Sequence, residues 1–447
     1  MQKRVLSSAI ALALTALASG TALAQSSVTI YGNVDVSFDR IKRDAGATDL
    51  TSKLLAGGVP STNDTAANVN RALTGAQSLT RVGPDMSSQS AIGFRGVEDL
   101  GNGYKANFVL EGQMGIDSGA LLRDGRLFGR QAFVGLTTPF GEVRVGRQYA
   151  PIFFSTAVIT TERFGGTDQF VEGGLTNALN IRWDNAITYS AQMGGFRGQL
   201  GFSPNAGVAD YVNANRGAAA SDTAGSILGG NNSGASSEKT SGRGRSYGAF
   251  GAYTMDALTL SLGYGATSYK NVNVGLLTLP SSLALFQLGD YKVWNMGAKY
   301  VLKDLGLTFS GTFGRGTYDI SGIGNAGPSS LSRTLFGLEN GSLAVSSLVL
   351  GTRYDIGAMG FLAQWSEVKF RNESRGKNQG ITLGAEYALS KRTTLYTRYA
   401  QVKDNGTGPA VVFALTGIRE VPSLGFSVPP APDGKVNLLG IGVRHSF

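Results

Sequence analysis

Few residues of this 447-residue chain could carry out covalent chemistry. It contains no cysteine and one histidine, His445, which excludes thiol catalysis and Cys-based metal sites and disfavours Ser-His catalysis and multi-histidine metal sites. Carboxylates are plentiful, but no separate pair stands out that could share the cleft needed for glycoside hydrolysis. The segment 322–327 matches a dinucleotide-binding fingerprint, yet it lies in an expected surface loop with no helix after it. These residues favour a protein that is not an enzyme and that needs no cofactor or metal.

The amino terminus has the order of a secretory signal. Lys3 and Arg4 are followed by an apolar run over 5–17 and by small residues that end at Ala24. The run is well short of the ~20 residues that a transmembrane helix needs, which disfavours a membrane anchor. We therefore expect a signal peptide over 1–24, cleaved after Ala24, and a single domain over 25–447.

The chain is basic. Lys and Arg number 40 against 31 Asp and Glu, a formal charge of +9 that falls to +7 when Lys3 and Arg4 leave with the signal. The basic residues are mostly arginines spread singly along the chain, which indicates a lined cavity more than a basic surface patch. An exported chain without a lysine-rich tract is not expected to bind nucleic acid.

A period of two dominates the chain after the signal. Apolar side chains over 28–38 alternate with polar ones such as Asp35, so one face of the expected strand is apolar and the other polar. The same alternation recurs over 104–113, 258–265 and 381–387. No stretch shows a sustained apolar stripe with helical spacing. The pattern predicts an all-β protein.

Short turns and long connections divide these strands. Seven tight turns are indicated, at 100–103, 139–141, 193–195, 255–256, 303–306, 357–360 and 390–392. Eight long polar or Gly/Ser-rich connections are expected at 41–86, 116–126, 150–180, 204–245, 270–290, 319–342, 371–379 and 403–434. Short connections on one side and long ones on the other are typical of a transmembrane β-barrel. Seven short turns, with both chain ends on one side, predict 16 antiparallel strands.

Two other architectures stay open at this point. An 18-stranded barrel is possible if the segment 411–426 contains a hairpin. A soluble β-sandwich or β-helix is the alternative class, but strand after strand would then aim charged side chains at the same interior. A closed barrel tolerates such a face because its interior, the lumen, holds water and its outer face meets lipid.

Five segments carry a resemblance to a known family: Gly93–Gly103, Phe128–Leu136, Phe140–Tyr149, Tyr387–Tyr396 and Gly440–Phe447. They resemble the general porins of Gram-negative, particularly β-proteobacterial, outer membranes. The resemblance implies a 16-stranded antiparallel transmembrane barrel with short periplasmic turns, long extracellular loops and an inward-folded third loop. It implies passive diffusion of small hydrophilic solutes and ions through a water-filled pore, outer-membrane lipid as surroundings, and a homotrimer. Phe447 would be the signal read by the assembly machinery, or a member of the interfacial aromatic girdle, or both.

The resemblance also implies where the pore is narrow. In the family, carboxylates of the third loop face arginines on the barrel wall, and such charges decide which ions pass. Here the loop is 150–180, and Arg163 stands where a carboxylate commonly precedes Phe-Gly-Gly, between Glu162 and Asp168. On the wall, Arg130 and Arg182 fall at the positions of pore-facing arginines.

One family arginine is missing. Its position is Ala91 here, and Arg95, on the same strand face but nearer the short turn, partly substitutes for it. The implied constriction therefore consists of Arg130, Arg182, Arg95, Glu162, Arg163 and Asp168. Arg163 and the +7 charge favour a weak anion preference, which three other lumen-facing carboxylates, Asp35, Glu111 and Glu386, oppose.

Three further functions have some support in the sequence. A channel selective for sugars or organic acids could use an aromatic path along the third loop, formed by Phe153, Phe154, Phe164 and Phe170. A barrel lipase or protease needs an activated histidine, but His445 is expected on the lipid-facing side of the last strand. A surface-binding protein could act through the long Gly/Ser/Asn-rich loops, although the sequence indicates no partner.

Overall fold

The computed structural model describes residues 27–45, 75–121, 126–161, 182–206, 244–275, 284–321, 341–371, 376–405 and 433–447. The expected signal peptide over 1–24 and the 411–426 segment lie outside these ranges. Within them, no helix has the length and apolar character needed to cross a bilayer.

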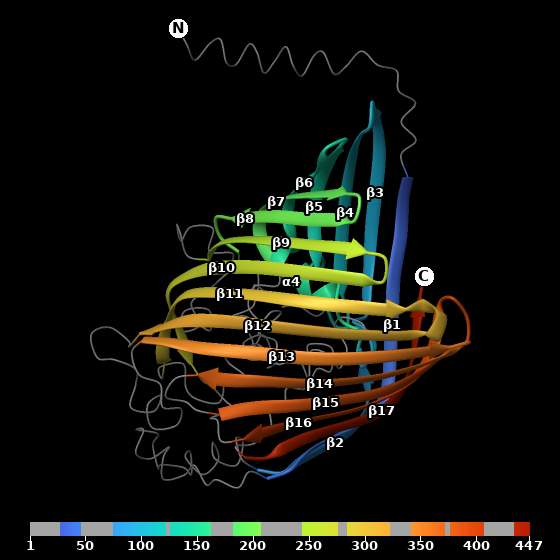
Figure 1. Cartoon of the computed structure of the whole chain (residues 1–447), viewed down its shortest axis with the longest axis vertical. Coiled ribbons are helices and arrows are strands. Elements are labelled where there is room, and N and C mark those ends of the chain that lie inside the picture. The colour runs from blue at the N-terminus through green and yellow to red at the C-terminus, as the bar shows by residue number, and fades with distance from the viewer. Residues whose placement is uncertain are drawn as a thin grey trace.

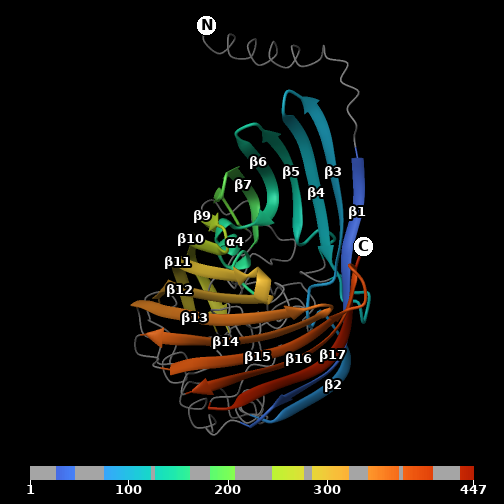
Figure 2. The same cartoon turned by 45° about the vertical axis from the view of Figure 1, so that its right-hand side comes forward.

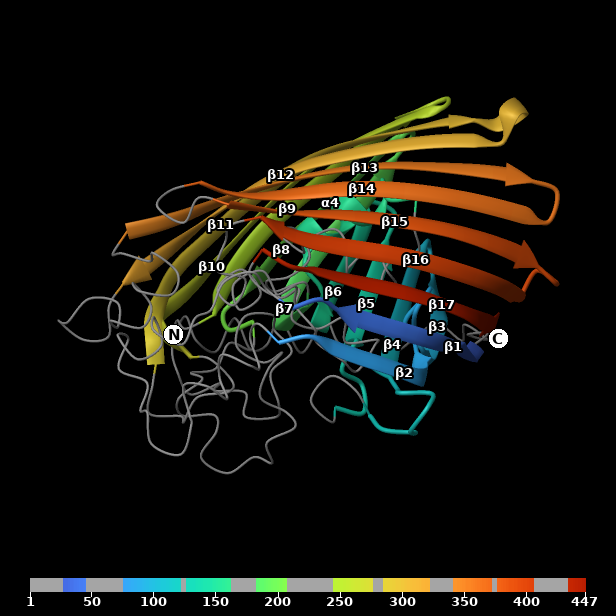
Figure 3. The same ribbon diagram turned by 90° about the horizontal axis from the view of Figure 1, so that it is seen from below.

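The described residues form one antiparallel sheet that closes on itself. Its strands are β1 (Ser27–Arg43), β2 (Gln77–Pro84), β3 (Ala91–Gly101), β4 (Tyr104–Gln113), β5 (Gln131–Thr138), β6 (Gly141–Tyr149), β7 (Arg182–Met193), β8 (Phe196–Ser203), β9 (Arg245–Met255), β10 (Leu258–Gly275), β11 (Ala284–Leu302), β12 (Leu307–Ser321), β13 (Gly341–Ile356), β14 (Met359–Arg371), β15 (Gly376–Ala388), β16 (Thr393–Asn405) and β17 (Lys435–Ser446). β2 and β3 both pair with β1, every later strand pairs with the next one in the chain, and β17 returns to pair with β1 (Figures 1 and 3).

The second transmembrane strand is built from two segments. β2 pairs with the second half of β1, from Val36 to Arg43, and β3 pairs with its first half, from Ser27 to Asn33. Residues 85–90 interrupt the strand between them. The seventeen segments therefore make a closed barrel of sixteen strands, which confirms the predicted number and rules out a two-layer sandwich.

The short turns are where the sequence places them, but some long connections are shorter than predicted. All seven tight connections join consecutive strands at one end of the barrel. The expected connection over 270–290 is mostly strand, because β10 runs to Gly275 and β11 starts at Ala284. Backbone pairing continues there beyond a register shift between Ser268 and Val272. Polar composition misled the prediction, since a ladder needs only backbone groups. The connection expected over 41–86 is wrong for the same reason, because it includes β2.

The two faces of the wall differ as the alternation predicts. On β10, Leu262 is 60% exposed on the outer face, whereas its neighbour Ser261 is 7% exposed on the inner face. On β17, Ile441 is exposed outside and Arg444 is buried inside. An apolar outer face suits lipid, where no water is available to hydrate polar side chains.

The third long connection begins with a short helix on the inner side of the barrel. This helix, α4 (Pro151–Ala157), lies within the ring of strands in Figure 2 and contacts β8 to β11. Ser261 Oγ donates to the Ser155 carbonyl at 2.6 Å, and Asn295 Nδ2 donates to Thr156 Oγ1 at 3.0 Å. These contacts confirm that the described start of the loop turns inward.

Glycines on the inner wall make room for this segment. A Cβ at Gly297 would lie 2.7 Å from Ile159 Cγ1, and one at Gly263 would collide with Ser155. Side chains at these positions would push α4 toward the middle of the lumen. The close approach of the helix to the wall therefore depends on residues that have no side chain.

We expect Gly297→Leu to displace the start of the third loop. Overpacking of this kind costs about 1–3 kcal/mol, so the folded protein should melt earlier, and its single-channel step conductance should change. Gly251→Leu is a matched control, since a Cβ there meets nothing closer than 3.5 Å. Equal melting temperature and conductance in both variants would show that α4 does not depend on the glycine.

Candidate functional site

Arg130 lies just before β5 and is held by three different segments of the chain. Its Nε donates to Glu111 Oε1 on β4, and its Nη1 donates to Gln89 Oε1. Its Nη2 donates to the hydroxyl of Tyr149 at the end of β6, at 3.0 Å. Glu111 also accepts a hydrogen bond of 2.8 Å from Tyr31. The guanidinium is therefore fixed against the wall in one orientation.

Arg182, the first residue of β7, lies on the other side of the same hydroxyl. Its Nη2 donates to Tyr149 at 2.8 Å, and its guanidinium carbon is 4.5 Å from the centre of the Tyr149 ring. That ring stacks on Phe153 of α4, with centroids 4.1 Å apart. The structure thus brings together Arg130 and Arg182, which the sequence indicates only as separate positions.

Arg182 has few partners for a buried cation. It is 0% exposed, and its Nε and Nη1 have no hydrogen-bond partner among the described residues. It forms no ion pair within the described part of the chain. An arginine side chain stays charged in proteins. The inner wall thus holds, at this height, a buried positive charge with two N–H groups that have no acceptor in the described part of the chain.

Two further arginines extend the cluster. Asp184 accepts hydrogen bonds from Arg126 at 3.0 Å and from Arg147. Arg147 Nε also donates to the carbonyl of Gly129 at 2.8 Å. We call Arg126, Arg130, Arg147, Arg182, Tyr149, Glu111 and Asp184 the arginine cluster. It contains four guanidinium groups against two carboxylates, counted over the residues that the structure describes.

Irregular backbone conformations position several side chains of the arginine cluster. The β6–β7 register shifts between Gly146 and Gln148, and Asn185 has a left-handed φ of 53°. Such bulges re-aim side chains. Sequence reasoning missed Arg147, Tyr149 and Asp184, because strict alternation cannot place side chains beyond a bulge. A left-handed conformation is most tolerated by Gly, Asn and Asp, so Asn185 was the available but weak signal.

Residues 85–90 form an inward segment between β2 and β3. The Asp85 amide donates to the Asp35 carbonyl at 3.0 Å, and the Ser90 amide donates to the Asp85 carboxylate at 2.6 Å. Met86 is completely buried in an apolar cluster on the inner wall with Ile41, Val402, Val436 and Leu438. This anchoring holds Gln89 against Arg130. No pattern in the sequence indicated that this segment lies in the lumen.

The lumen-facing carboxylates that oppose an anion preference are all engaged. Glu386 lies 2.6 Å from Arg398, 3.0 Å from Arg353 and 3.5 Å from Arg444. Asp35 accepts a hydrogen bond from the Tyr396 hydroxyl. Glu111 is bound to Arg130, as described above. Arginines thus largely offset the charges of Glu386 and Glu111, whereas Asp35 is bound by a neutral hydroxyl.

The remaining expected site residues have different outcomes. Arg95 faces the lumen near the short-turn end, with its guanidinium carbon 5.1 Å from the centre of the Tyr31 ring. Ala91 is buried on the same face, opposite Gln113. Glu162, Arg163 and Asp168 lie outside the described residues, as do Phe164 and Phe170.

Two residues singled out in the sequence lie at the end of β17. His445 is exposed on the outer face, and its Nδ1 is 2.9 Å from Thr393 Oγ1. The backbone of Phe447 exchanges two hydrogen bonds of 3.1 Å with Gly32 of β1, so the terminus takes part in closing the barrel.

Comparisons with known proteins agree with this geometry. A family model described as Gram-negative porin matches residues 9–407. Outer membrane porin protein 32 of Delftia acidovorans and an outer membrane porin protein of Bordetella pertussis are each 27% identical, over 98% of this chain and 99% of theirs.

Among solved structures, the anion-selective porin from Comamonas acidovorans matches with a TM-score of 0.60 at 22% identity, covering 95% of this chain and 100% of that one. The trimer form of OmpT from Vibrio cholerae matches with a TM-score of 0.58 at 13% identity, covering 94% and 99%. The chain forms a closed sixteen-stranded barrel with a charged lumen and an apolar outer face, and the family model matches most of its length. It therefore belongs to the Gram-negative porins and is an outer-membrane porin.

Proposed function

We propose that this porin is a general diffusion channel for small hydrophilic solutes and ions, with a weak preference for anions. The observation that carries the proposal is the arginine cluster, where four guanidinium groups face two carboxylates and Arg182 has no ion pair among the described residues. Charges that line a narrow passage raise the local concentration of the opposite ion. The solved porin from Comamonas acidovorans, whose fold this chain shares, is described as anion-selective, which agrees with the proposal.

The third loop would complete the constriction. α4 directs the chain into the lumen beside Tyr149. Arg163, in the place of a carboxylate, would add positive charge there, while Glu162 and Asp168 would supply the opposing negative groups. We propose that these three residues, with Arg130 and Arg182, set the selectivity, and that Arg95 acts nearer the periplasmic mouth.

A channel for organic acids is the second candidate. Arg130 and Arg182 flank one hydroxyl, and paired guanidinium groups bind carboxylates well. A sugar path is less favoured, because Tyr149 and Phe153 stack on each other and are largely buried. Block of chloride current by millimolar succinate would favour the organic-acid channel, and undiminished current would favour the general porin.

The remaining parts of the proposal concern the mature protein. We propose that it begins after Ala24, acts as a channel without enzymatic activity, and assembles as a homotrimer. A trimeric relative in fold, OmpT, supports the last point. Phe447 would serve in assembly recognition through its place at the end of the closing strand. Channel closure in three equal steps in a planar bilayer would support the trimer, and single steps only would contradict it.

We expect Arg182→Gln to weaken the anion preference. A unit charge about 5 Å from a permeating ion in water contributes about 0.8 kcal/mol, so the chloride-to-potassium permeability ratio should fall roughly fourfold. The measurement is the reversal potential in a planar bilayer under a KCl gradient. Arg315→Gln, an exposed residue on the outer face of β12, is the matched control and should leave the ratio unchanged. Cation preference in the parent protein, or an unchanged ratio in Arg182→Gln, would overturn the electrostatic argument.

We expect Tyr149→Phe to act differently, since it keeps every charge. Two arginines would lose their shared acceptor, which costs about 1–3 kcal/mol for buried groups, and their side chains would move. The melting temperature should fall and the step conductance should change, while the reversal potential keeps its sign. Tyr189→Phe, which removes an outer-face hydrogen bond of 2.6 Å to the Phe140 carbonyl, is the control. If both variants behave alike, Tyr149 does not position the arginines.

A further inference from the structure

Four polar side chains line the lumen on the consecutive strands β8 to β11, close to the short turns. Lys299 and Thr259 are cross-strand partners, as are Thr259 and Thr254. Thr259 is two residues from Ser261, which lies on the inner face, so these three side chains point into the lumen. The short turns of this fold are periplasmic, so the residues lie at the periplasmic mouth of the pore. We call Arg197, Thr254, Thr259 and Lys299 the exit niche.

The start of the third loop orients Arg197. The guanidinium carbon of Arg197 lies 5.7 Å from the centre of the Phe250 ring on β9. Phe250 is buried, and its ring centre is 6.0 Å from that of Phe154 on α4. Ser155 of the same helix accepts a hydrogen bond from Ser261. The helix therefore bounds the niche on the side away from the short turns and fixes the ring on which its arginine lies.

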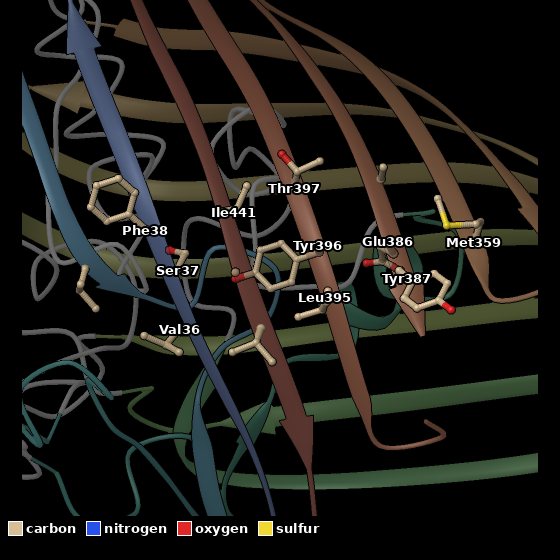
Figure 4. Close-up of a pocket in the computed structure, with 14 residues that line it drawn as sticks. Val36, Ser37, Phe38, Met359, Glu386, Tyr387, Leu395, Tyr396, Thr397 and Ile441 are labelled. Carbon is tan, nitrogen blue, oxygen red and sulfur yellow. The ribbon is translucent and has the colours of Figure 1, made fainter. Parts of the chain in front are cut away.

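The two cations of the exit niche have no counter-charge on the wall. Neither Arg197 nor Lys299 forms an ion pair or a side-chain hydrogen bond among the described residues, and the like charge of Arg197 acts on Lys299. Farther along the wall, Arg353 and Arg398 are matched by Glu386, which Figure 4 shows near its cross-strand partner Tyr396. An anion between Arg197 and Lys299 would turn their repulsion into two attractions.

The spacing of the niche suits one small anion. Three strand spacings separate β8 from β11, about 14 Å, and the two side chains are long enough to reach a solute in this gap from both sides. Between them, Thr254 Oγ1 lies 3.1 Å from Thr259 Oγ1. One of these hydroxyls donates to the other, which leaves the second hydrogen for an oxygen atom of the solute.

We propose that the exit niche binds the doubly charged phosphate group of a small solute. Arg197 and Lys299 contact its oxygens from two sides, and a threonine hydroxyl donates to a third oxygen. Phosphate carries acceptors in every direction and binds guanidinium and ammonium groups well, which suits donors arranged around it. The inference rests on the proposed role as a diffusion channel and deepens it, because it adds a second station that a solute meets beyond the arginine cluster.

The test measures the binding of inorganic phosphate to the folded, full-length porin in detergent by isothermal titration calorimetry. The buffer is mildly alkaline, so that phosphate is doubly charged, and has physiological ionic strength, which screens distant charges. The parent should bind phosphate saturably. Lys299→Gln should bind it roughly fifteenfold more weakly, the effect of a unit charge about 5 Å from a dianion in water.

Two further variants separate the niche from the general field of the lumen. Thr254→Val with Thr259→Val keeps every charge and should weaken binding roughly fivefold, the effect of one ordinary hydrogen bond. Lys105→Gln is the matched control, since it removes a charge of the lumen-facing row of β4, almost opposite β11 in the ring of strands. It should bind phosphate as the parent does, and all variants should melt at the same temperature.

Several results would overturn the inference. Unchanged phosphate affinity in Lys299→Gln would place the phosphate elsewhere, and equal losses in Lys299→Gln and Lys105→Gln would reduce the niche to a general field. Tighter binding of succinate than of phosphate would refute the assigned chemistry. The reversal potential separates this inference from the proposed function. Anion preference with phosphate affinity unchanged in Lys299→Gln refutes the niche alone, whereas cation preference with lysine-dependent phosphate binding refutes the proposed selectivity alone.

Discussion

The pairing of β1 with β17 is the interaction on which the rest of this structure depends. Eleven consecutive residue pairs, from Asn33 with Ser446 to Arg43 with Val436, join the two ends of the chain. In lipid, an unpaired backbone amide or carbonyl costs several kcal/mol, because no water can replace the lost partner. An open sheet would expose two such edges. Closure is therefore a condition for the barrel to exist in a membrane, and Phe447 extends it by two bonds to Gly32.

Closure creates a lumen wall whose charged side chains are hydrated by bulk water from one side only. The wall meets this demand with arginines that are each shared among several oxygens, as Arg130 is among Glu111, Gln89 and Tyr149. Glu386 lies among three guanidinium groups on the other strands. Arg182 departs from this pattern, since only the Tyr149 hydroxyl accepts from it among the described residues. A nearby carboxylate would stabilise such a buried cation, so the proposal of a role in solute selection rests on this departure.

The same closure creates an outer face whose composition follows depth. Apolar residues such as Phe38 and Ile441 occupy the hydrocarbon level, and Lys403 and Lys435 occupy the headgroup level. The inner and outer faces use the same strands with opposite parity, so β16 presents Arg398 to the lumen and Thr397 to lipid. One backbone thus serves a channel and a lipid-facing surface, and a substitution on one face leaves the other largely unaffected.

The sequence by itself determined what depends on local spacing. The period of two assigned Asp35, Glu111 and Glu386 to the lumen and His445 to lipid, and the seven turns predicted sixteen strands. The resemblance to the porins placed Arg130 and Arg182 on the lumen wall. These hold because side-chain direction in a strand follows from position alone. Only the tertiary structure decided which lumen residues meet. The Tyr149 hydroxyl accepts hydrogen bonds from Arg130 and from Arg182, which is 33 positions away, and a bulge in the β6–β7 pairing shifts the alternation there. Gln89 reaches Arg130 because it lies on an inward segment that resembles a loop in sequence.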